Sequence, residues 1–307
     1  MLPPTGESCT LVEWTIEHDR SADGKQHVGF MAFHHVERVD QMGNILNHDQ
    51  VAVMTIDRLG GVFTRDDDVP DTPIVKVALP GPGLIDEDMV ELKALESLPD
   101  LKRLVLHFNP ITDAALSVLR SFSPALQELD LEGTDVTDEG LTALREFRCL
   151  RAVNLDRTRL TGVGLGQLCA CVQLEELALR DTLLGDAGLE ELSGIRSLRK
   201  LALNGTRITD GGLVNLKKLT NLRQLLLNKT AITDVGVPTL RELKGLQTLY
   251  LDGCKLTGQG VAELRRSIPT CDTSFFSDLA RHSPKVSSAL RVNANAAKLP
   301  SGGPLTS

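Results

Sequence analysis

A repeat of fixed length constrains this chain more than any other feature. Leucines recur in the pattern L-x-x-L-x-L, and the first leucine of each copy falls at Leu101, Leu126, Leu150, Leu174, Leu198, Leu222 and Leu246. The spacing is 25 residues once and then 24 residues five times, and a divergent copy begins at Ile74. Seven copies in register predict thin units that each bury one face against the next, because a single unit of this length cannot bury its leucines alone.

Each position of the repeat has a predicted task, counted from its first leucine. Positions 1, 4 and 6 form a short strand with positions 4 and 6 inward, so positions 3, 5 and 7 point outward. Position 9 is Asn or Thr in six copies, where a polar side chain can bond backbone groups that the turn leaves unpaired. Position 11 is always aliphatic and is expected in the core. Positions 16 and 19, such as Leu213 and Leu216, predict the buried side of a short helix.

Two polar or small positions complete the repeat. Position 13 is Asp in five copies and stands just ahead of G-L-x-x-L, which predicts a cap for its own helix, worth about 1 kcal/mol. Gly162 and Gly258 replace this Asp in the third and seventh copies, which predicts weaker helices there. Position 15 is Gly in six copies, and we infer that the missing Cβ lets adjacent helices stack closely.

The sequence divides into four parts. They are a poorly defined N-terminal segment (1–46), an N-terminal cap with the divergent first repeat (47–99), seven repeats with a C-terminal cap (100–276), and a tail (277–307). The first part suggests two strand segments around an ADGKQ turn. The second predicts a helix that stops at Gly60 or Gly61. Beyond Pro269 we expect one last strand, and the Ala-, Ser-, Pro- and Asn-rich tail is predicted to be disordered.

Composition narrows the possible classes further. Aromatic residues make up 3% of the chain, so aliphatic side chains must fill the core. The net charge of −8 argues against nucleic acid or an anionic membrane as the main partner. The start, MLPPTGESCTLVEWT, lacks the basic and apolar parts of a secretory signal, and no apolar run approaches the roughly 20 residues of a membrane span. Six scattered cysteines then indicate reduced thiols in a cytoplasmic protein.

The repeat L-x-x-L-x-L-x-x-T-x-[IVL]-T-D-x-G-L-x-x-L resembles the leucine-rich repeat superfamily, in particular its ribonuclease-inhibitor-like and cysteine-containing branches. It is most similar to a bacterial group with 24-residue T-D-x-G-L repeats, whose entry and exit segments resemble LGGVFTRDDDVPDTPIVKVAL and LRRSIPTCDTSFF. The resemblance implies an α/β fold, a right-handed leucine-rich repeat solenoid with a curved parallel sheet on the concave side and short helices on the convex side. It also implies recognition, commonly of proteins.

No catalytic constellation is present in the sequence. The chain lacks the G-x-S-x-G elbow, the phosphate-binding G-x-x-x-x-G-K-[ST] loop and the zinc-binding H-E-x-x-H helix. Cys169 and Cys171 form a C-x-C pair, but Cys171 shares its repeat position with Phe147, Ile195 and Leu219, which favours a buried apolar thiol over a zinc ligand. We therefore expect no enzyme activity, no cofactor and no metal.

The outward positions 3, 5 and 7 are the best candidates for a binding surface. Along the repeats these positions predict an acidic patch, then two cations, and then a less charged patch with Leu and Tyr that resembles a small interaction hot spot. The predicted partner-binding residues on this concave face are Glu128, Asp130, Glu132, Asp156, Arg180, Lys200, Leu226 and Tyr250. A second, basic stripe is predicted at positions 8 and 10, from Arg157, Arg159, Arg207, Lys229 and Lys255. The alternative is charge that any soluble solenoid scatters over its sheet.

The main functional hypothesis is a monomeric, non-enzymatic scaffold that binds a protein partner through the concave face. The alternative is the substrate-recognition adaptor of a ubiquitin ligase, because F-box proteins also carry T-D-x-G-L repeats. The N-terminus lacks the L-P-x-E-[LI] signature of an F-box and reads as strands and turns, not as three helices. A third hypothesis, repeats that present substrate to a catalytic domain, would need more than the 31-residue tail from Ser277.

Overall fold

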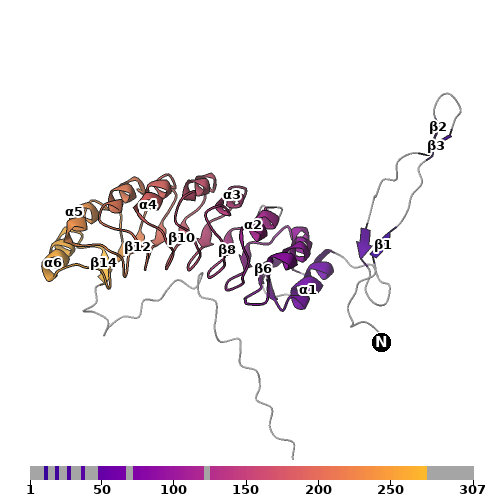
Figure 1. The fold of residues 1–307 in the computed structure, drawn as a ribbon, viewed down its shortest axis with the longest axis horizontal. Coiled ribbons are helices and arrows are strands. Elements are labelled where there is room, and N and C mark those ends of the chain that lie inside the picture. Colours follow the sequence, from indigo (N-terminus) through magenta and orange to yellow (C-terminus); the bar gives the residue numbers. More distant parts are fainter. Residues whose placement is uncertain are drawn as a thin grey trace, which may run out of the picture.

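Figure 1 shows the fold of the computed structural model, which describes residues 48–66, 72–120 and 125–274 together with four short strands nearer the N-terminus. These strands form two antiparallel pairs, β1 (Thr10–Val12) with β4 (Val36–Arg38) and β2 (His18–Arg20) with β3 (Gln26–Val28). Strands therefore lie on either side of the ADGKQ turn as predicted, but as two short strands on each side and not as one segment. The tail, predicted to be disordered, lies outside the described residues.

One sheet of ten strands runs through all the repeats. Its order follows the chain from β5 to β14, and every neighbouring pair is parallel except β5 with β6. Paired residues of successive repeats are mostly 24 positions apart, as in Glu176 with Lys200. The strands are β5 (Val62–Arg65), β6 (Ile74–Ala78), β7 (Arg103–Val105), β8 (Glu128–Asp130), β9 (Ala152–Asn154), β10 (Glu176–Ala178), β11 (Lys200–Ala202), β12 (Gln224–Leu226), β13 (Thr248–Tyr250) and β14 (Asp272–Ser274).

Short helices cover the side opposite the strands, along the upper edge of the repeats in Figure 1. The α-helices are α1 (His48–Arg58), α2 (Asp113–Leu119), α3 (Leu141–Leu144), α4 (Asp186–Leu192), α5 (Val237–Leu240) and α6 (Gly258–Ser267). The 3₁₀ segments are η2 (Asp86–Ser97), η3 (Leu165–Ala170), η4 (Gly212–Lys218) and η5 (Asp234–Gly236). A parallel sheet on one side and short helices on the other confirm the predicted α/β architecture.

Both ends of the repeat array are closed as the flanking sequence predicts. Helix α1 ends before Gly60, whose φ of +69° is the left-handed conformation that glycine adopts most easily. Ala52 and Ile56 of α1 are fully buried in the shared core. At the other end, after Pro269, β14 adds a last strand beside β13. These segments cover the leucines that an open end would expose to water.

The core is a continuous column of aliphatic side chains. The Leu or Val residues at positions 1, 4 and 6 of the seven repeats are at most 5% exposed. Position 11 is fully buried in six repeats, and only Leu256, in the last repeat, is half-buried. The threonine hydroxyl at position 9 donates to the carbonyl of position 6, as from Thr206 to Leu203 at 2.6 Å. The tasks predicted for these positions are therefore confirmed.

The task predicted for the aspartate at position 13 is wrong. Its carboxylate does not cap its own helix but binds the threonine at position 12 of the next repeat. Thr233 donates its N–H to Asp210 at 2.9 Å and its hydroxyl at 2.6 Å, and its oxygen accepts from Val235 N–H to cap the helix. We call the series of such links the Asp–Thr ladder: Asp86–Thr112, Asp113–Thr137, Asp138–Thr161, Asp186–Thr209, Asp210–Thr233 and Asp234–Thr257.

The Asp–Thr ladder explains two observations on glycine. In four of the six copies (Gly140, Gly212, Gly236 and Gly260) the glycine at position 15 lies against the carboxylate of the preceding repeat, and a Cβ on Gly236 would come 2.5 Å from Asp210 Oδ1. The close stacking inferred from the sequence is confirmed, and the carboxylate is its main cause. Gly258 needs no aspartate because no repeat follows it. Helix α6, which starts there, has 10 residues and is capped by the side chain of Thr257, so the missing cap from which the weakening of this copy was predicted is supplied by another residue.

Within the described repeats the ladder has one gap, between the third and fourth copies. Both partners are glycine there, Gly162 at position 13 and Gly185 at position 12. Gly162 has a φ of +100°, and a Cβ on it would come 2.7 Å from Gly188 Cα. Close contact between glycine backbones thus replaces the polar link, while β9 and β10 remain paired.

Candidate functional site

The concave face consists of the side chains at positions 3, 5 and 7, which neighbouring strands hold in rows about 4.8 Å apart. The register places Asp130 beside Asn154 and Leu226 beside Tyr250. The predicted residues lie on β8 and just after it (Glu128, Asp130, Glu132), after β9 and β10 (Asp156, Arg180), and on β11, β12 and β13 (Lys200, Leu226, Tyr250). The sheet therefore brings them onto one surface, as expected, while their part in binding a partner stays a prediction.

Three of these eight side chains are poorly accessible, which corrects the expectation that they all face solvent. Asp130 is 5% exposed, Asp156 6% and Lys200 8%. Strands spaced at about 4.8 Å leave little room between rows, so longer side chains from adjacent strands can cover the short Asp130 and Asp156. Lys200 instead lies against Glu176, 3.1 Å from its ammonium group. A partner at this face would meet Glu132, Arg180 and the apolar pair before it met the buried carboxylates.

The charges of the concave face are largely paired with one another. Five ion pairs join neighbouring repeats: Lys200–Glu176 (3.1 Å), Arg103–Glu128 (3.2 Å), Arg157–Glu132 (3.5 Å), Arg180–Asp156 (3.7 Å) and His107–Asp130 (3.7 Å, charged when His107 is protonated). Each carboxylate of the predicted acidic patch has such a neighbour. The patch therefore exerts less long-range attraction on a basic partner than four acidic residues in sequence suggest.

Asp156 is the most perturbed carboxylate of this face. Burial raises its pKa to about 6, although the hydrogen bond from Arg180 N–H at 2.6 Å and the Arg180 charge oppose that shift. Glu132 and Asp130 raise the pKa of Asp156 further. The arrangement makes Asp156 a pH-dependent structural contact between two repeats.

Leu226 and Tyr250 form the accessible apolar part of the face. They are partners across β12 and β13, and both are half-buried. Next to them a polar row follows position 7: Asn204 Oδ1 accepts from Asn228 N–H at 2.9 Å, and Asn228 Oδ1 accepts from Asp252 N–H at 2.8 Å. An apolar pair beside a row of fixed amide groups is a surface that can hold another protein.

Position 8 carries a backbone constraint that the sequence interpretation missed. In every one of the seven repeats it is left-handed, with φ between +53° and +75°, although only three have glycine there (Gly133, Gly205, Gly253) and the other four carry Phe108, Arg157, Asp181 and Lys229. A side chain in this conformation costs roughly 1–2 kcal/mol. Phe108 is 46% exposed and its ring lies over Gly133. The glycines that recur at position 8 are the feature of the sequence that could have indicated this left-handed conformation.

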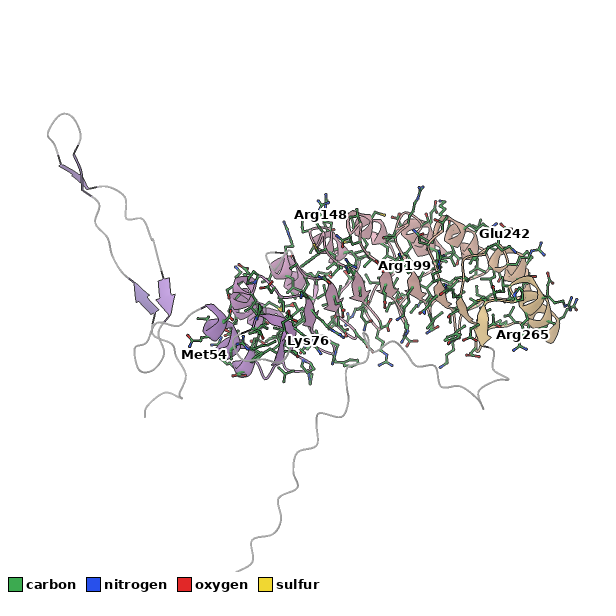
Figure 2. All side chains as sticks on the ribbon, turned by 180° about the vertical axis from the view of Figure 1, so that it is seen from behind. Met54, Lys76, Arg148, Arg199, Glu242 and Arg265 are labelled. Carbon is green, nitrogen blue, oxygen red and sulfur yellow. The ribbon has the colours of Figure 1, made fainter. Side chains whose placement is uncertain are left out.

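Figure 2 shows the side chains of the described residues, among them the cysteines and carboxylates that could carry catalytic or metal chemistry. Among the described residues no group of three or more His, Cys, Asp and Glu is placed to hold a metal ion. Cys171 is fully buried, as predicted, and burial raises the pKa of its thiol to about 11. Cys169 of the same C-x-C pair is exposed. In the described part of the chain no helix is long and apolar enough to cross a membrane.

Comparison with known proteins agrees with the geometry of the repeats. Models of the leucine-rich repeat family match residues 123–144, 194–217 and 245–267. The chain is built of leucine-rich repeats. Among solved structures, internalin C2 from Listeria monocytogenes superposes on this leucine-rich repeat solenoid with a TM-score of 0.54 and 18% sequence identity, over 77% of this chain and 87% of that one. No curated protein sequence matches the chain. The ribonuclease-inhibitor-like subtype stays a prediction.

Proposed function

We propose that this leucine-rich repeat solenoid is a non-enzymatic scaffold that holds a protein partner against its concave face. One observation carries the proposal most directly. Leu226 and Tyr250 form an accessible apolar pair on a face whose charges are largely paired internally. Affinity there would come mainly from covering this pair, while Glu132 and Arg180 at its N-terminal side would set the partner's orientation.

The adaptor function in a ubiquitin ligase is less well supported. An F-box consists of three helices, whereas the described elements of the N-terminal segment are the strands β1 to β4. The cytoplasmic location and the monomeric state stay predictions.

Affinity capture with mass spectrometry from the native host tests the proposal. The bait is the full chain, compared with Leu226→Ala/Tyr250→Ala and with the control variant Val214→Ala/Val235→Ala, which removes exposed apolar side chains from the convex side. We expect specific partners that the control variant retains and the concave variant loses. Identical partner profiles for all three baits would exclude the concave face as the binding site.

A further inference from the structure

The helix-to-strand edge of the solenoid carries a charge pattern that the concave face lacks. We define this edge by position 23 of one repeat and position 2 of the next, which flank the buried leucine at position 1. Seven of these positions hold cations: Lys102, Arg148, Arg151, Arg196, Arg199, Arg223 and Lys244. Glu175 is the one anion at these positions, so the eight side chains sum to +6 in a chain whose net charge is −8.

Stabilisation of helix ends does not explain these cations. Lysine and arginine in the last turn of a helix offset its negative end, which accounts for Lys217 and Lys218 in η4. Positions 23 and 2 lie beyond the helices. Glu175 bridges Arg151 at 3.9 Å and Arg199 at 3.3 Å, which orders the two guanidinium groups and leaves the edge cationic. Figure 2 labels Arg148 and Arg199, two exposed members of this edge.

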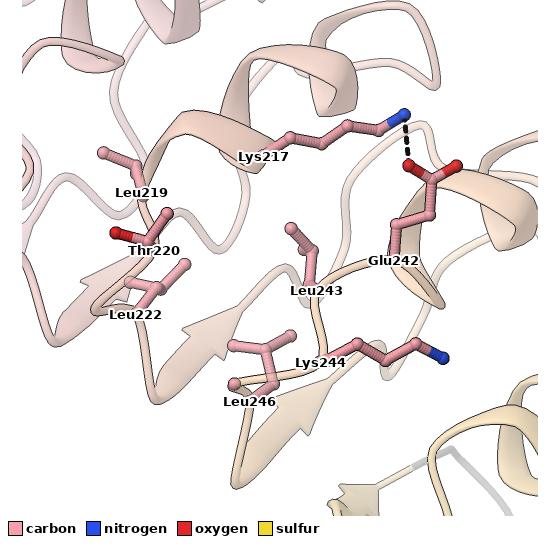
Figure 3. A pocket seen from close by; sticks show the side chains of 9 residues that line it. Lys217, Leu219, Thr220, Leu222, Glu242, Leu243, Lys244 and Leu246 are labelled. Atoms are coloured by element: carbon pink, nitrogen blue, oxygen red, sulfur yellow. Dashed lines mark ion pairs between the residues drawn. The ribbon is translucent and has the colours of Figure 1, made fainter.

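A pocket of about 180 Å³ opens in the same edge, between the loops that follow η4 and α5 (Figure 3). Leu219, Leu222, Leu243 and Leu246 supply the apolar part of its lining, and Lys217 and Lys244 stand at its rim. Leu243 is 9% exposed and Leu246 5%, whereas the corresponding core side chains of the second to fifth repeats are at most 3% exposed. At this edge the core is therefore less sealed at the pocket than in the second to fifth repeats.

Arg223 joins the backbone of three residues that line this pocket. Arg223 Nη1 donates to the carbonyls of Leu222 at 3.1 Å, Thr220 at 3.3 Å and Gly245 at 3.4 Å. A Cβ on Gly245 would come 2.5 Å from the same nitrogen, so glycine makes room for the guanidinium. Lys217 is paired with Glu242 at 2.7 Å, and Lys244 is exposed at the rim.

We infer that this pocket and the basic edge around it form a second docking site, which takes an acidic protein segment carrying one apolar anchor side chain. A volume of about 180 Å³ suits a single side chain, since pockets for drug-sized ligands span roughly 300–1,000 Å³. An anchor in an apolar pocket commonly supplies most of the affinity of an interface. The surrounding arginines suit carboxylates because their forked donors match a carboxylate's two oxygens. The site is separate from the concave face and does not depend on the function proposed above.

A protein segment fits this edge better than a nucleic acid or a membrane does. Proteins that bind single-stranded nucleic acid stack bases on aromatic rings, and the described part of this edge exposes none. Outside the eight edge side chains the chain carries −14, which would repel a long polyanion or an anionic bilayer extending beyond the edge. A short acidic segment avoids that repulsion, and its anchor uses the apolar wall.

Selection from a displayed library of random peptides on the full chain, followed by titration of the enriched peptides, tests the inference. We expect enrichment of an aliphatic or aromatic residue flanked by Asp and Glu, and binding that weakens with added salt. Arg223→Glu/Lys244→Glu should weaken it at least about tenfold, or about 1.4 kcal/mol. Replacement of the peptide's apolar residue by Ser should have a similar effect.

The matched control is Arg207→Glu/Lys255→Glu, which makes the same charge change on the opposite edge and should leave peptide binding unchanged. Arg223→Gln/Lys244→Gln serves if the glutamate variant does not fold. The Leu226→Ala/Tyr250→Ala variant should bind the peptides normally, which separates this site from the concave face. No acidic enrichment, peptide binding that survives both Arg223/Lys244 variants, or tighter binding to single-stranded DNA or phosphatidylserine vesicles would overturn the inference.

Discussion

Removal of one link of the Asp–Thr ladder is expected to destabilise the solenoid by an amount that can be assigned to that link. Asp210 accepts two bonds from Thr233, one from its N–H and one from its hydroxyl, and both residues are half-buried. A hydrogen bond to a charged acceptor contributes about 1.5–3 kcal/mol, and partial exposure reduces this. We therefore expect Asp210→Ala to lower the free energy of unfolding by about 2–3 kcal/mol.

Thr233→Val removes the hydroxyl bond to Asp210 and the helix cap, but it keeps the backbone N–H. With a cap worth about 1 kcal/mol, we expect a total loss of about 2 kcal/mol. The double variant loses the shared hydroxyl bond only once. Its cost should therefore be smaller than the sum of the two single costs by about 1–2 kcal/mol.

Guanidinium unfolding followed by circular dichroism measures these costs, and hydrogen exchange shows whether the change lies at the fifth and sixth repeats. The control cycle combines Asp210→Ala with Thr257→Val, two residues that share no hydrogen bond, since Thr257 binds Asp234. That cycle should be additive within about 0.5 kcal/mol. If the costs of Asp210→Ala and Thr233→Val also add within about 0.5 kcal/mol in the double variant, the ladder is refuted as an energetic link between repeats.

Three further substitutions test other contacts. The pKa of Asp156 is raised to about 6 from 3.8, so between these values the folded chain binds more protons than the unfolded chain, and stability falls as pH rises from about 3.8 to about 6 and then stays level. Asp156→Asn, which keeps an acceptor for Arg180 N–H, should raise the unfolding free energy at pH 7.5 by on the order of 2 kcal/mol and flatten its pH dependence in urea titrations; an unchanged pH slope contradicts this. Gly185→Ser should stabilise by about 0.5–1 kcal/mol, because the residue stands at the start of α4 with φ −119° and open space at its Cβ. Gly162→Ala, at φ +100°, should destabilise by about 1 kcal/mol or more, and similar melting temperatures for the two variants would argue against the backbone account.

The sequence predicts the repeat frame well because each buried position depends on near neighbours. The leucines of one strand and the aliphatic position 11 recur in every copy, and a spacing of 24 residues leaves few ways to bury them. The hydroxyl of Thr206 bonds three residues back, so its partner was also within reach of the sequence. The predicted fold therefore needed no knowledge of contacts between repeats.

Contacts between repeats are where sequence interpretation failed. Asp210 stands next to the start of its own helix in the chain, yet its partner Thr233 lies 23 residues away. The low exposure of Lys200 likewise depends on Glu176 in the preceding repeat. The basic edge was missed because positions 23 and 2 belong to different repeats, and only alignment of all copies one above another brings their cations together.

The gap at Gly162 and Gly185 determines where this array can be cut or joined. Division of the chain at any of the six linked interfaces leaves an aspartate or a threonine without its partner on the new end. Division between the third and fourth repeats separates two glycines and breaks no Asp–Thr link, and of the contacts described above it separates Asp156 from Arg180. Repeats four to seven, with their C-terminal cap, therefore form the natural module for transplantation onto another array. An array lengthened beyond the seventh repeat would instead need an aspartate in place of Gly258.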